Sequence, residues 1–212
     1  MLPWRAMGRV QTEGTSCTGT LIGNRTVLTA AHCLYNPRSQ RMMPASAIHF
    51  LRAYHRGEYA GHSTVEQVVV GRNYDPGHPK ESAVADWAIL ILSEHLGAHG
   101  NSLAIARSSV DPGTEAVLGG YGRDRVEVMR ADTDCKIIDT LAAKDGSLLR
   151  HDCDSTFGNS GGALLVKENG SWKVAGVHVA FVTSSASKSS GTAWGIAVAA
   201  PTFAQTAQLY AR

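Results

Sequence analysis

Apolar and polar residues alternate in short runs along most of the chain, and Gly, Pro, Asn and Asp separate these runs. Alternation with a period of two is typical of β-strands, and sustained helical periodicity is scarce. The pattern therefore predicts an all-β fold. Strands are expected at residues 18–22, 26–29, 48–54, 65–70 and 87–92 in the first half, and at 115–120, 126–131, 148–153, 163–166, 173–181 and 192–198 in the second.

Turn residues predict how some strands connect. Gly23-Asn24-Arg25 closes a hairpin between the first two strands, and residues 167–170 (KENG) close another in the second half. The run 87–92 (WAILIL) is apolar on both faces, as in a buried strand. A C-terminal helix is expected after Pro201, because Phe203, Ala207 and Tyr210 fall on one face.

A stretch without apolar pattern divides the chain near its middle. Residues 107–113 (RSSVDPG) combine Ser, Asp, Pro and Gly, which favour an irregular connection. We therefore expect two domains, residues 1–106 and 107–212. A chain of 212 residues, 43% hydrophobic, is long enough to bury one large core or two modest ones.

Composition and charge argue against several partners. No run reaches the roughly 18 apolar residues of a membrane span, and the first residues lack the apolar centre of a signal peptide. The formal charge is +2, and Lys and Arg are scattered among acids. We therefore expect neither a membrane nor nucleic acid as a partner, and we expect a monomer.

The four cysteines fall into two pairs, Cys17 with Cys33 and Cys135 with Cys153, separated by 16 and 18 residues. Neither pair has the two-residue spacing of a zinc knuckle, so two disulfides are expected. In the chain-entropy model each such loop contributes about 3 kcal/mol. Disulfides indicate an oxidising compartment, which favours a secreted or periplasmic protein whose export signal was removed before Met1.

Three polar residues stand in positions suited to nucleophilic catalysis. Ser160 lies among glycines in FGNSGG, His32 lies beside Cys33 in TAAHC, and Asp86 precedes the apolar strand WAILIL. A serine hydroxyl needs a base and a site for the oxyanion, which the backbone amides of Gly158 and Ser160 would supply. Taken singly, each residue also fits a structural role: a Gly-rich loop, a packed core histidine and a turn residue that begins a strand.

Together these motifs resemble the chymotrypsin/trypsin-like serine protease family, which uses the same order His, Asp, Ser along the chain. The resemblance runs from about Pro3 to the C-terminal helix. It implies two six-stranded antiparallel β-barrels, with His32 and Asp86 in the first and Ser160 in the second. It also implies a His32–Asp86–Ser160 triad, an oxyanion hole at Gly158 and Ser160, an acyl-enzyme intermediate, a Cys17–Cys33 disulfide and a protein or peptide substrate without a cofactor.

One residue departs from the cleavage-activated members, which have Asp before the nucleophile and a new N-terminus that pairs with it. Here the position holds Asn159, whose neutral amide cannot form that ion pair. Bacterial members that resemble glutamyl endopeptidases also carry GNSG. We therefore expect hydrogen bonds to hold the oxyanion loop in place of a freed amine.

Two residues give opposite predictions of specificity. Asp154 occupies the place where tryptic members keep an acid for Arg or Lys. His178 matches a histidine that glutamyl endopeptidases use for acidic side chains, and Ser155 would assist it. A third possibility is that Asp154 and His178 pair with each other. The candidate substrate-binding residues are Asp154, Ser155, His178, Val179, Ala180 and Phe181, the last three contacting the substrate backbone by β-augmentation.

Other candidates carry less chemistry. A Cys135–Cys153 disulfide would stiffen the specificity segment that Cys153 enters. His95 and His99 have a spacing that suits a metal on a helix, but the flanking glycines favour a surface loop, and Asp132 and Asp134 are read as solvated acids. No metal site is predicted. The rival functions are a catalytically silent, protease-shaped peptide-binding module and an esterase with the same triad chemistry.

Overall fold

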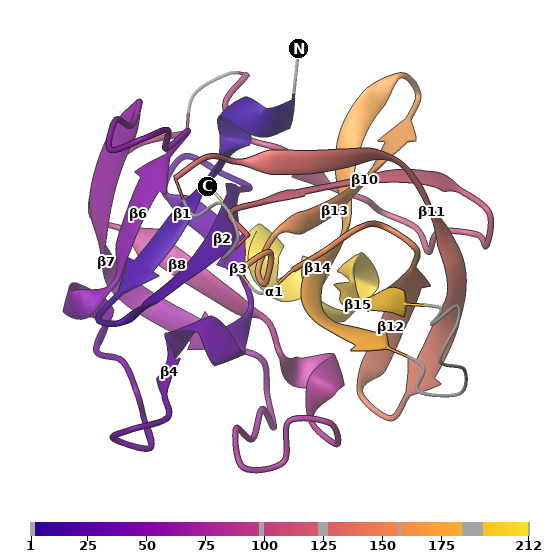
Figure 1. Ribbon diagram of the computed structural model, residues 1–212, viewed down its shortest axis with the longest axis horizontal. Helices are drawn as coiled ribbons and strands as arrows, with labels where there is room; N and C mark the ends of the chain where they lie inside the picture. Colours follow the sequence, from indigo (N-terminus) through magenta and orange to yellow (C-terminus); the bar gives the residue numbers. More distant parts are fainter. Residues whose placement is uncertain (1–2, 98–99, 123–126, 157, 184–192, 212) are drawn as a thin grey trace.

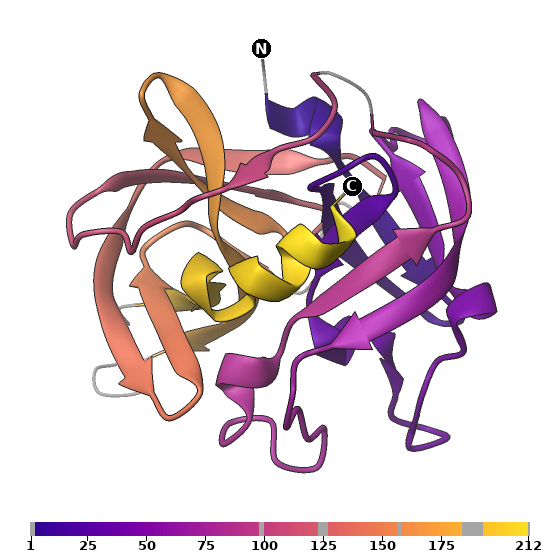
Figure 2. The ribbon, with the colours of Figure 1, turned by 180° about the vertical axis from the view of Figure 1, so that it is seen from behind.

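Two β-barrels lie side by side in the computed structural model, which describes residues 3–97, 100–122, 127–156, 158–183 and 193–211 (Figure 1). The C-terminal helix α1, Ala200–Tyr210, lies across the back of the molecule (Figure 2). Short 3-10 helices lie at Pro3–Ala6 (η1), Ala31–Leu34 (η2), Ala45–Ala47 (η3) and Ala83–Ala85 (η4). None of the described helices is long and apolar enough to cross a membrane.

The first barrel closes in the order β1-β2-β3-β8-β7-β6, and every neighbouring pair is antiparallel. Its strands are Met7–Thr12 (β1), Thr15–Leu21 (β2), Thr26–Thr29 (β3), His49–Arg52 (β6), Gly61–Val70 (β7) and Ala88–Leu92 (β8). A small two-stranded sheet of Tyr35–Asn36 (β4) and Arg41–Met42 (β5) lies outside it. The predicted hairpin around Gly23 is confirmed as β2–β3.

The second barrel follows the order β13-β10-β11-β12-β15-β14 and closes through pairing of β14 with β13. Its antiparallel strands are Glu115–Gly120 (β10), Arg130–Ala143 (β11), Gly146–His151 (β12), Ala163–Glu168 (β13), Ser171–Thr183 (β14) and Ala193–Ala199 (β15). The prediction of two six-stranded antiparallel barrels with a C-terminal helix is confirmed. The short strand Ala104–Ile105 (β9) adds to β14 in parallel.

Four of the described strands, β1, β4, β5 and β9, were not predicted. Closure of the first barrel requires β1 to pair with both β2 and β6. The strand predicted at 126–131 is instead β11, which begins at Arg130 and continues to Ala143. Only Cys135 and Ile137 of β11 are buried, so its side chains show little alternation of apolar and polar residues. The strand is held mainly by backbone pairing with β10 and β12. Val126, and Thr192 at the start of the last predicted strand, lie outside the described residues.

The connection between the barrels contacts both of them. Leu103 donates its amide to the carbonyl of Leu21 in the first barrel (2.9 Å), and Ala106 donates to Val174 in the second (2.9 Å). The last residues before the expected division at 106 and 107 therefore already contact the second barrel. The division itself stays a prediction.

Both predicted disulfides are present. Cys17 on β2 is bonded to Cys33 on η2, with Cα atoms 6.1 Å apart. Cys135 on β11 is bonded to Cys153, just after β12, with Cα atoms 4.8 Å apart. Each bridge therefore joins a strand to a segment that carries candidate chemistry.

The helix α1 is held by burial of its apolar face. Phe203 is fully buried, and its ring lies 6.1 Å from that of Trp87, which precedes β8 of the first barrel. α1 also contacts β12, β14 and β15 of the second barrel. The helix therefore contacts both halves of the molecule, and Phe203 provides its ring contact with Trp87.

Replacing Phe203 with Ala should lower the free energy of unfolding by about 3 to 5 kcal/mol, because a large buried side chain is lost and a cavity remains. Urea denaturation measures this change. The matched control is Leu209→Ala on the same helix, where the side chain is 66% exposed, and its effect should stay within about 0.5 kcal/mol. Equal midpoints for the two variants would contradict the assigned role of Phe203.

Candidate active site

His32 lies on η2, directly after β3 of the first barrel. The next residue, Cys33, is bonded to Cys17 on β2, so the disulfide ties the short helix to the barrel wall. The side chain of His32 is about one-third exposed. The imidazole is therefore anchored through its backbone while one edge stays accessible.

Asp86 binds His32 through two hydrogen bonds. The Nδ1–H of His32 donates to Asp86 Oδ2 at 2.7 Å, and the backbone N–H of His32 donates to Oδ1 at 2.8 Å. The Asp86 side chain is only 10% exposed, at the end of η4 and just before β8. Because a carboxylate only accepts hydrogen bonds, this contact places the proton on Nδ1 and leaves the lone pair on Nε2.

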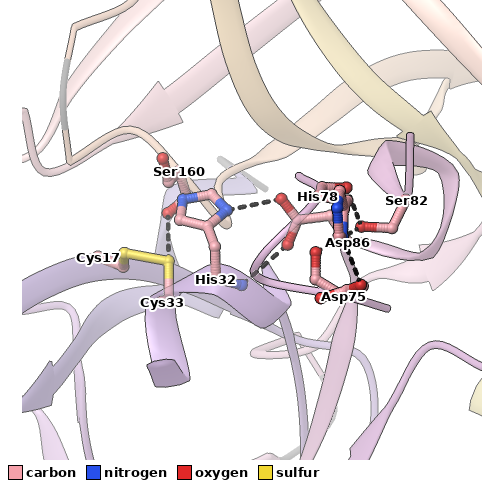
Figure 3. Close-up of polar contacts among 8 residues, drawn as sticks. All are labelled: Cys17, His32, Cys33, Asp75, His78, Ser82, Asp86 and Ser160. Carbon is pink, nitrogen blue, oxygen red and sulfur yellow. Dashed lines mark hydrogen bonds and ion pairs between the residues drawn. A yellow bond between two sulfur atoms is a disulfide. The ribbon is translucent and has the colours of Figure 1, made fainter. Parts of the chain in front are cut away.

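Ser160 lies in the turn between β12 and β13 and reaches the first barrel through its backbone. Its carbonyl accepts a hydrogen bond from the amide of Thr18 on β2 at 2.9 Å and lies 3.8 Å from Cys33 Sγ. Figure 3 shows the imidazole of His32 with Asp86 on one side and Ser160 on the other. Among the described residues no hydrogen bond joins the Ser160 hydroxyl to His32, and such contacts are often loose before substrate binds.

The turn around Ser160 has its carbonyl groups bound. The Gly158 carbonyl accepts from Thr18 Oγ1 (3.1 Å), the Asn159 carbonyl from the Gly162 amide (2.8 Å) and the Ser160 carbonyl from the Thr18 amide. Within the described chain the amides of Gly158 and Ser160 donate to no protein acceptor. These two N–H groups are therefore the ones available to an oxyanion.

At two positions of the motif FGNSGG the backbone geometry explains why the residue is glycine. Gly158 has φ of 100°, in the left-handed region that favours glycine, and the amide of the next residue, Asn159, donates to the Thr156 carbonyl (3.1 Å). Gly161 has φ of 82°, and a Cβ there would lie 2.1 Å from the Thr18 carbonyl oxygen. Any other residue at position 161 would separate the turn from the first barrel.

Asn159 stabilises this turn with its side chain. It is buried, and its Oδ1 accepts hydrogen bonds from the backbone amide (3.2 Å) and the hydroxyl (3.3 Å) of Thr156. The neutral side-chain amide of Asn159 thus adds two hydrogen bonds across the same turn, between Asn159 and Thr156. These contacts agree with the expectation that hydrogen bonds hold the oxyanion loop.

The two candidate specificity residues occupy different environments. Asp154 is exposed and, with Ser155, lines a cavity of about 410 Å³ whose other charged residues are Arg130 and Asp132. The Asp154 amide donates to Asp132 Oδ2 at 2.8 Å. His178 on β14 is buried, and its partner is His151, so the proposed pairing with Asp154 is not formed.

His151 and His178 make a buried hydrogen bond, with Nε2 of His151 3.1 Å from Nδ1 of His178. The residues lie two strands apart, on β12 and β14, with β15 between them, and Gly195 of β15 is the register partner of His151. A Cβ at Gly195 would lie 2.0 Å from the His151 ring, so the ring crosses β15 where this strand has no side chain.

Burial keeps both of these imidazoles neutral. It lowers the pKa of His151 to about 4, against the partial opposition of Asp152 and Asp132. Burial also lowers the pKa of His178 well below its usual value, and charge on His151 or His32 lowers it further. His178 therefore lies close enough to the candidate base His32 to respond to its charge.

The backbone of His178 is hydrogen-bonded to the turn that carries Ser160. The amide of Gly161 donates to the His178 carbonyl (2.8 Å), and the His178 amide donates to the Gly162 carbonyl (2.9 Å). Pairing of β14 with β13 ends at Val177. Val179 is buried, Ala180 is exposed and Phe181 is partly exposed.

The remaining sequence candidates have structural surroundings. Asp132 accepts hydrogen bonds from the amides of Asp134 and Asp154, so its carboxylate organises the backbone. His95 is exposed, and His99 and Phe157 lie outside the described residues. A second acid–histidine pair, Asp75 and His78, lies in the exposed loop before Asp86 (Figure 3). This hydrogen bond raises the pKa of His78 and lowers that of Asp75.

Sequence reasoning missed two residues of this region. Thr18 donates hydrogen bonds to the Gly158 and Ser160 carbonyls in the turn that carries Ser160. In the sequence it is marked only by its position in a predicted strand, next to Cys17. His151 contacts His178 across an intervening strand, a relation that sequence separation does not reveal. Both contacts depend on barrel closure.

Known proteins are similar to this chain in sequence and in fold. The glutamyl endopeptidase of Bacillus licheniformis is 24% identical over 208 residues, covering 90% of this chain and 59% of the relative. The cercarial protease of Schistosoma mansoni is 30% identical over 126 residues, 53% of this chain and 46% of the relative. The chain spans about half the length of the curated relatives it matches.

A solved structure described as Glu endopeptidase in complex with MPD superposes with a TM-score of 0.73 at 21% identity, covering 100% of this chain and 93% of the other. At that identity the likeness supports the fold. The family model described as Trypsin matches residues 1–205, nearly the whole chain. The protein therefore belongs to the trypsin family.

Proposed function

We propose that the protein is a serine endopeptidase in which Ser160 is the nucleophile, His32 the general base and Asp86 its orienting acid. The observation that carries this proposal is the pair of hydrogen bonds from His32 to Asp86, which direct the basic Nε2 away from the carboxylate. Ser160 lies on that side of the ring (Figure 3). The unbound amides of Gly158 and Ser160 complete the set of groups that acyl transfer needs.

In the proposed reaction the Ser160 oxygen attacks the peptide carbonyl carbon as His32 Nε2 takes the hydroxyl proton. The carbonyl oxygen becomes an oxyanion that accepts hydrogen bonds from the two amides. His32 then gives its proton to the leaving amine, and an acyl-enzyme remains. Water repeats the sequence and releases the acid. Asp86 stabilises the imidazolium in both halves of the reaction.

Peptide rather than simple ester substrates are favoured by the strand next to the site. Pairing of β14 with β13 ends at Val177. The next residue, His178, is hydrogen-bonded to the turn that carries Ser160. A substrate strand would dock from Val179 onward by β-augmentation. Relatives named as proteases support the same substrate class. The two disulfides fit an oxidising compartment, and a secreted or periplasmic location belongs to this proposal.

A fluorophosphonate probe tests the nucleophile. Wild-type protein should be labelled at Ser160 and should cleave a denatured protein, and Ser160→Ala should lose both activities. Asp86→Asn should lower kcat by about 10⁴-fold, because the imidazole loses the partner that fixes its tautomer. A folded wild type that neither reacts nor cleaves would reject the protease and favour the silent peptide-binding module. Hydrolysis of esters without cleavage of peptides would favour the esterase.

For specificity we propose a preference for acidic side chains before the cut, with His178 as the recognising residue. Asp154 is exposed, so solvent screens its attraction for a basic side chain. Nδ1 of His178 is occupied by His151, so Nε2 remains for a substrate carboxylate. The name of the Bacillus relative, glutamyl endopeptidase, supports the same preference.

Mass spectrometry of a digested protein mixture reads this preference directly from the residue on the acyl side of each cut. Wild-type protein should cut mainly after Glu, and His178→Ala should lose this selectivity by about tenfold or more, the size of one hydrogen bond to a charged group. Asp154→Ser should leave it unchanged. Abundant cuts after Arg and Lys that disappear in Asp154→Ser would instead establish the basic preference.

The neutral histidine pair predicts acid sensitivity of the fold. The folded-state pKa of His151, about 4, lies below its ordinary value of 6.5, so the unfolded chain takes up the proton first as pH falls. Stability should therefore decline between about pH 6.5 and 4, by up to about 1.4 kcal/mol per pH unit for each such histidine.

Denaturant titrations at several pH values measure that slope. His151→Gln removes one of the two buried imidazoles and should make the slope shallower. His78→Gln is the control, because its exposed pair with Asp75 raises the pKa of His78, and it should leave the slope in this window unchanged. An identical slope for wild type and His151→Gln would refute the assignment.

A further inference from the structure

Thr18 of β2 has every polar atom engaged at the contact between the two barrels. It is fully buried. Its amide donates to the Ser160 carbonyl (2.9 Å), and its carbonyl accepts from Thr29 Oγ1 (2.8 Å). Its hydroxyl contacts two groups, the Gly158 carbonyl at 3.1 Å and the Tyr121 amide at 2.9 Å. A threonine in the first barrel thus binds both carbonyls that flank Asn159.

The Thr18 hydroxyl can donate its proton to only one of its two partners. The Tyr121 amide can only donate, so the Thr18 oxygen accepts from it. A hydroxyl has a single proton, and the Gly158 carbonyl can only accept. The Thr18 hydroxyl therefore donates to the Gly158 carbonyl, and this assignment does not depend on any titration.

This hydrogen bond adds a contact from the first barrel to a peptide group whose only other backbone hydrogen bond among the described residues is local. The peptide between Gly158 and Asn159 is held at its carbonyl by Thr18 and at its N–H by the Thr156 carbonyl. Because the peptide is planar, both contacts set its orientation. Glycine adopts many backbone conformations at little cost, so Gly158 does not select this one by itself. Loss of the Thr18 hydroxyl would let the peptide rotate and move the neighbouring Gly158 N–H.

The same strand also positions the base. Cys17 precedes Thr18, and its disulfide with Cys33 anchors the residue next to His32. Two consecutive residues of β2 therefore fix the imidazole and the oxyanion turn relative to each other. A change at Thr18 would act on the turn while the His32–Asp86 hydrogen bonds remain.

We propose that Thr18 is a positioning residue for transition-state stabilisation: its hydroxyl, from the first barrel, holds the Gly158 peptide of the second so that the Gly158 and Ser160 amides bind the oxyanion. The inference rests on the proposed function, since it takes Ser160 as the nucleophile. Thr18 contacts no reacting atom, so its effect reaches the reaction through the turn.

Steady-state kinetics on a peptide substrate, with Thr18→Val as the variant, tests the proposal. Valine keeps the size and removes the hydroxyl. We expect kcat to fall by about 10- to 100-fold, less than the loss of a whole oxyanion donor, with KM changed less than about threefold. Affinity for a peptide boronate, which forms a tetrahedral adduct, should fall by a similar factor as kcat. Thr18→Ser, which keeps the hydroxyl, should restore both.

Thr20→Val is the matched control. Thr20 lies on the same strand and is equally buried, but its hydroxyl has no hydrogen-bond partner among the described residues. The same chemical change there should leave kcat and boronate affinity within about twofold of wild type, since no hydrogen bond is removed. A larger loss in Thr18→Val than in Thr20→Val therefore measures the hydroxyl and not a general effect of a buried substitution.

The outcomes separate this inference from the proposed function. A wild type that lacks fluorophosphonate labelling overturns both. An active wild type whose Thr18→Val variant matches Thr20→Val in kcat, or loses only KM, overturns the positioning role alone. If Thr18→Val does not fold, the comparison of Thr18→Ala with Thr18→Ser applies the same criterion, and equal kcat values for those two variants would overturn the role.

Discussion

The contact between β2 and the nucleophile turn is the interaction on which the site depends. The proposed triad residues come from two barrels, and each barrel closes on its own strands. Nothing in either barrel alone sets the distance between an imidazole in one and a hydroxyl in the other. The hydrogen bonds from Thr18 to the carbonyls of Gly158 and Ser160 contribute to that constraint directly at the site, and the adjacent Cys17–Cys33 disulfide extends it to His32.

The composition of the nucleophile motif follows from this close approach. Gly161 lies against the carbonyl of Thr18, where a Cβ would overlap it, and Gly162 lies against the carbonyl of Gly119 in the same way. The glycines therefore permit the turn to contact backbone on two sides. Their conformational freedom is a disadvantage in an oxyanion site, and the surrounding hydrogen bonds, including those of Asn159, remove it.

The second barrel places two neutral histidines where a packed core would ordinarily be apolar. A buried polar group is costly unless it has a hydrogen-bond partner, and each imidazole is the partner of the other. Gly195 makes that contact possible across an intervening strand. Nδ1 of His151 is buried without a hydrogen-bond partner among the described residues. An unpaired buried acceptor costs less free energy than an unpaired buried N–H. This favours a proton on His151 Nε2, donated to His178.

The sequence by itself determined the all-β fold, most strands, both disulfides and the residues that carry candidate chemistry, because alternation, turn residues and short motifs are local signals. It did not determine β1 or the extent of β11, whose side chains show little pattern and whose backbones are held by neighbouring strands. The family resemblance implied that Asp86 meets His32, but tertiary structure alone decided that His178 pairs with His151 and not Asp154, and that Thr18 binds the carbonyls of Gly158 and Ser160. Barrel closure brings these groups together from distant parts of the chain, and no local pattern records which distant residues a closed sheet will place in contact.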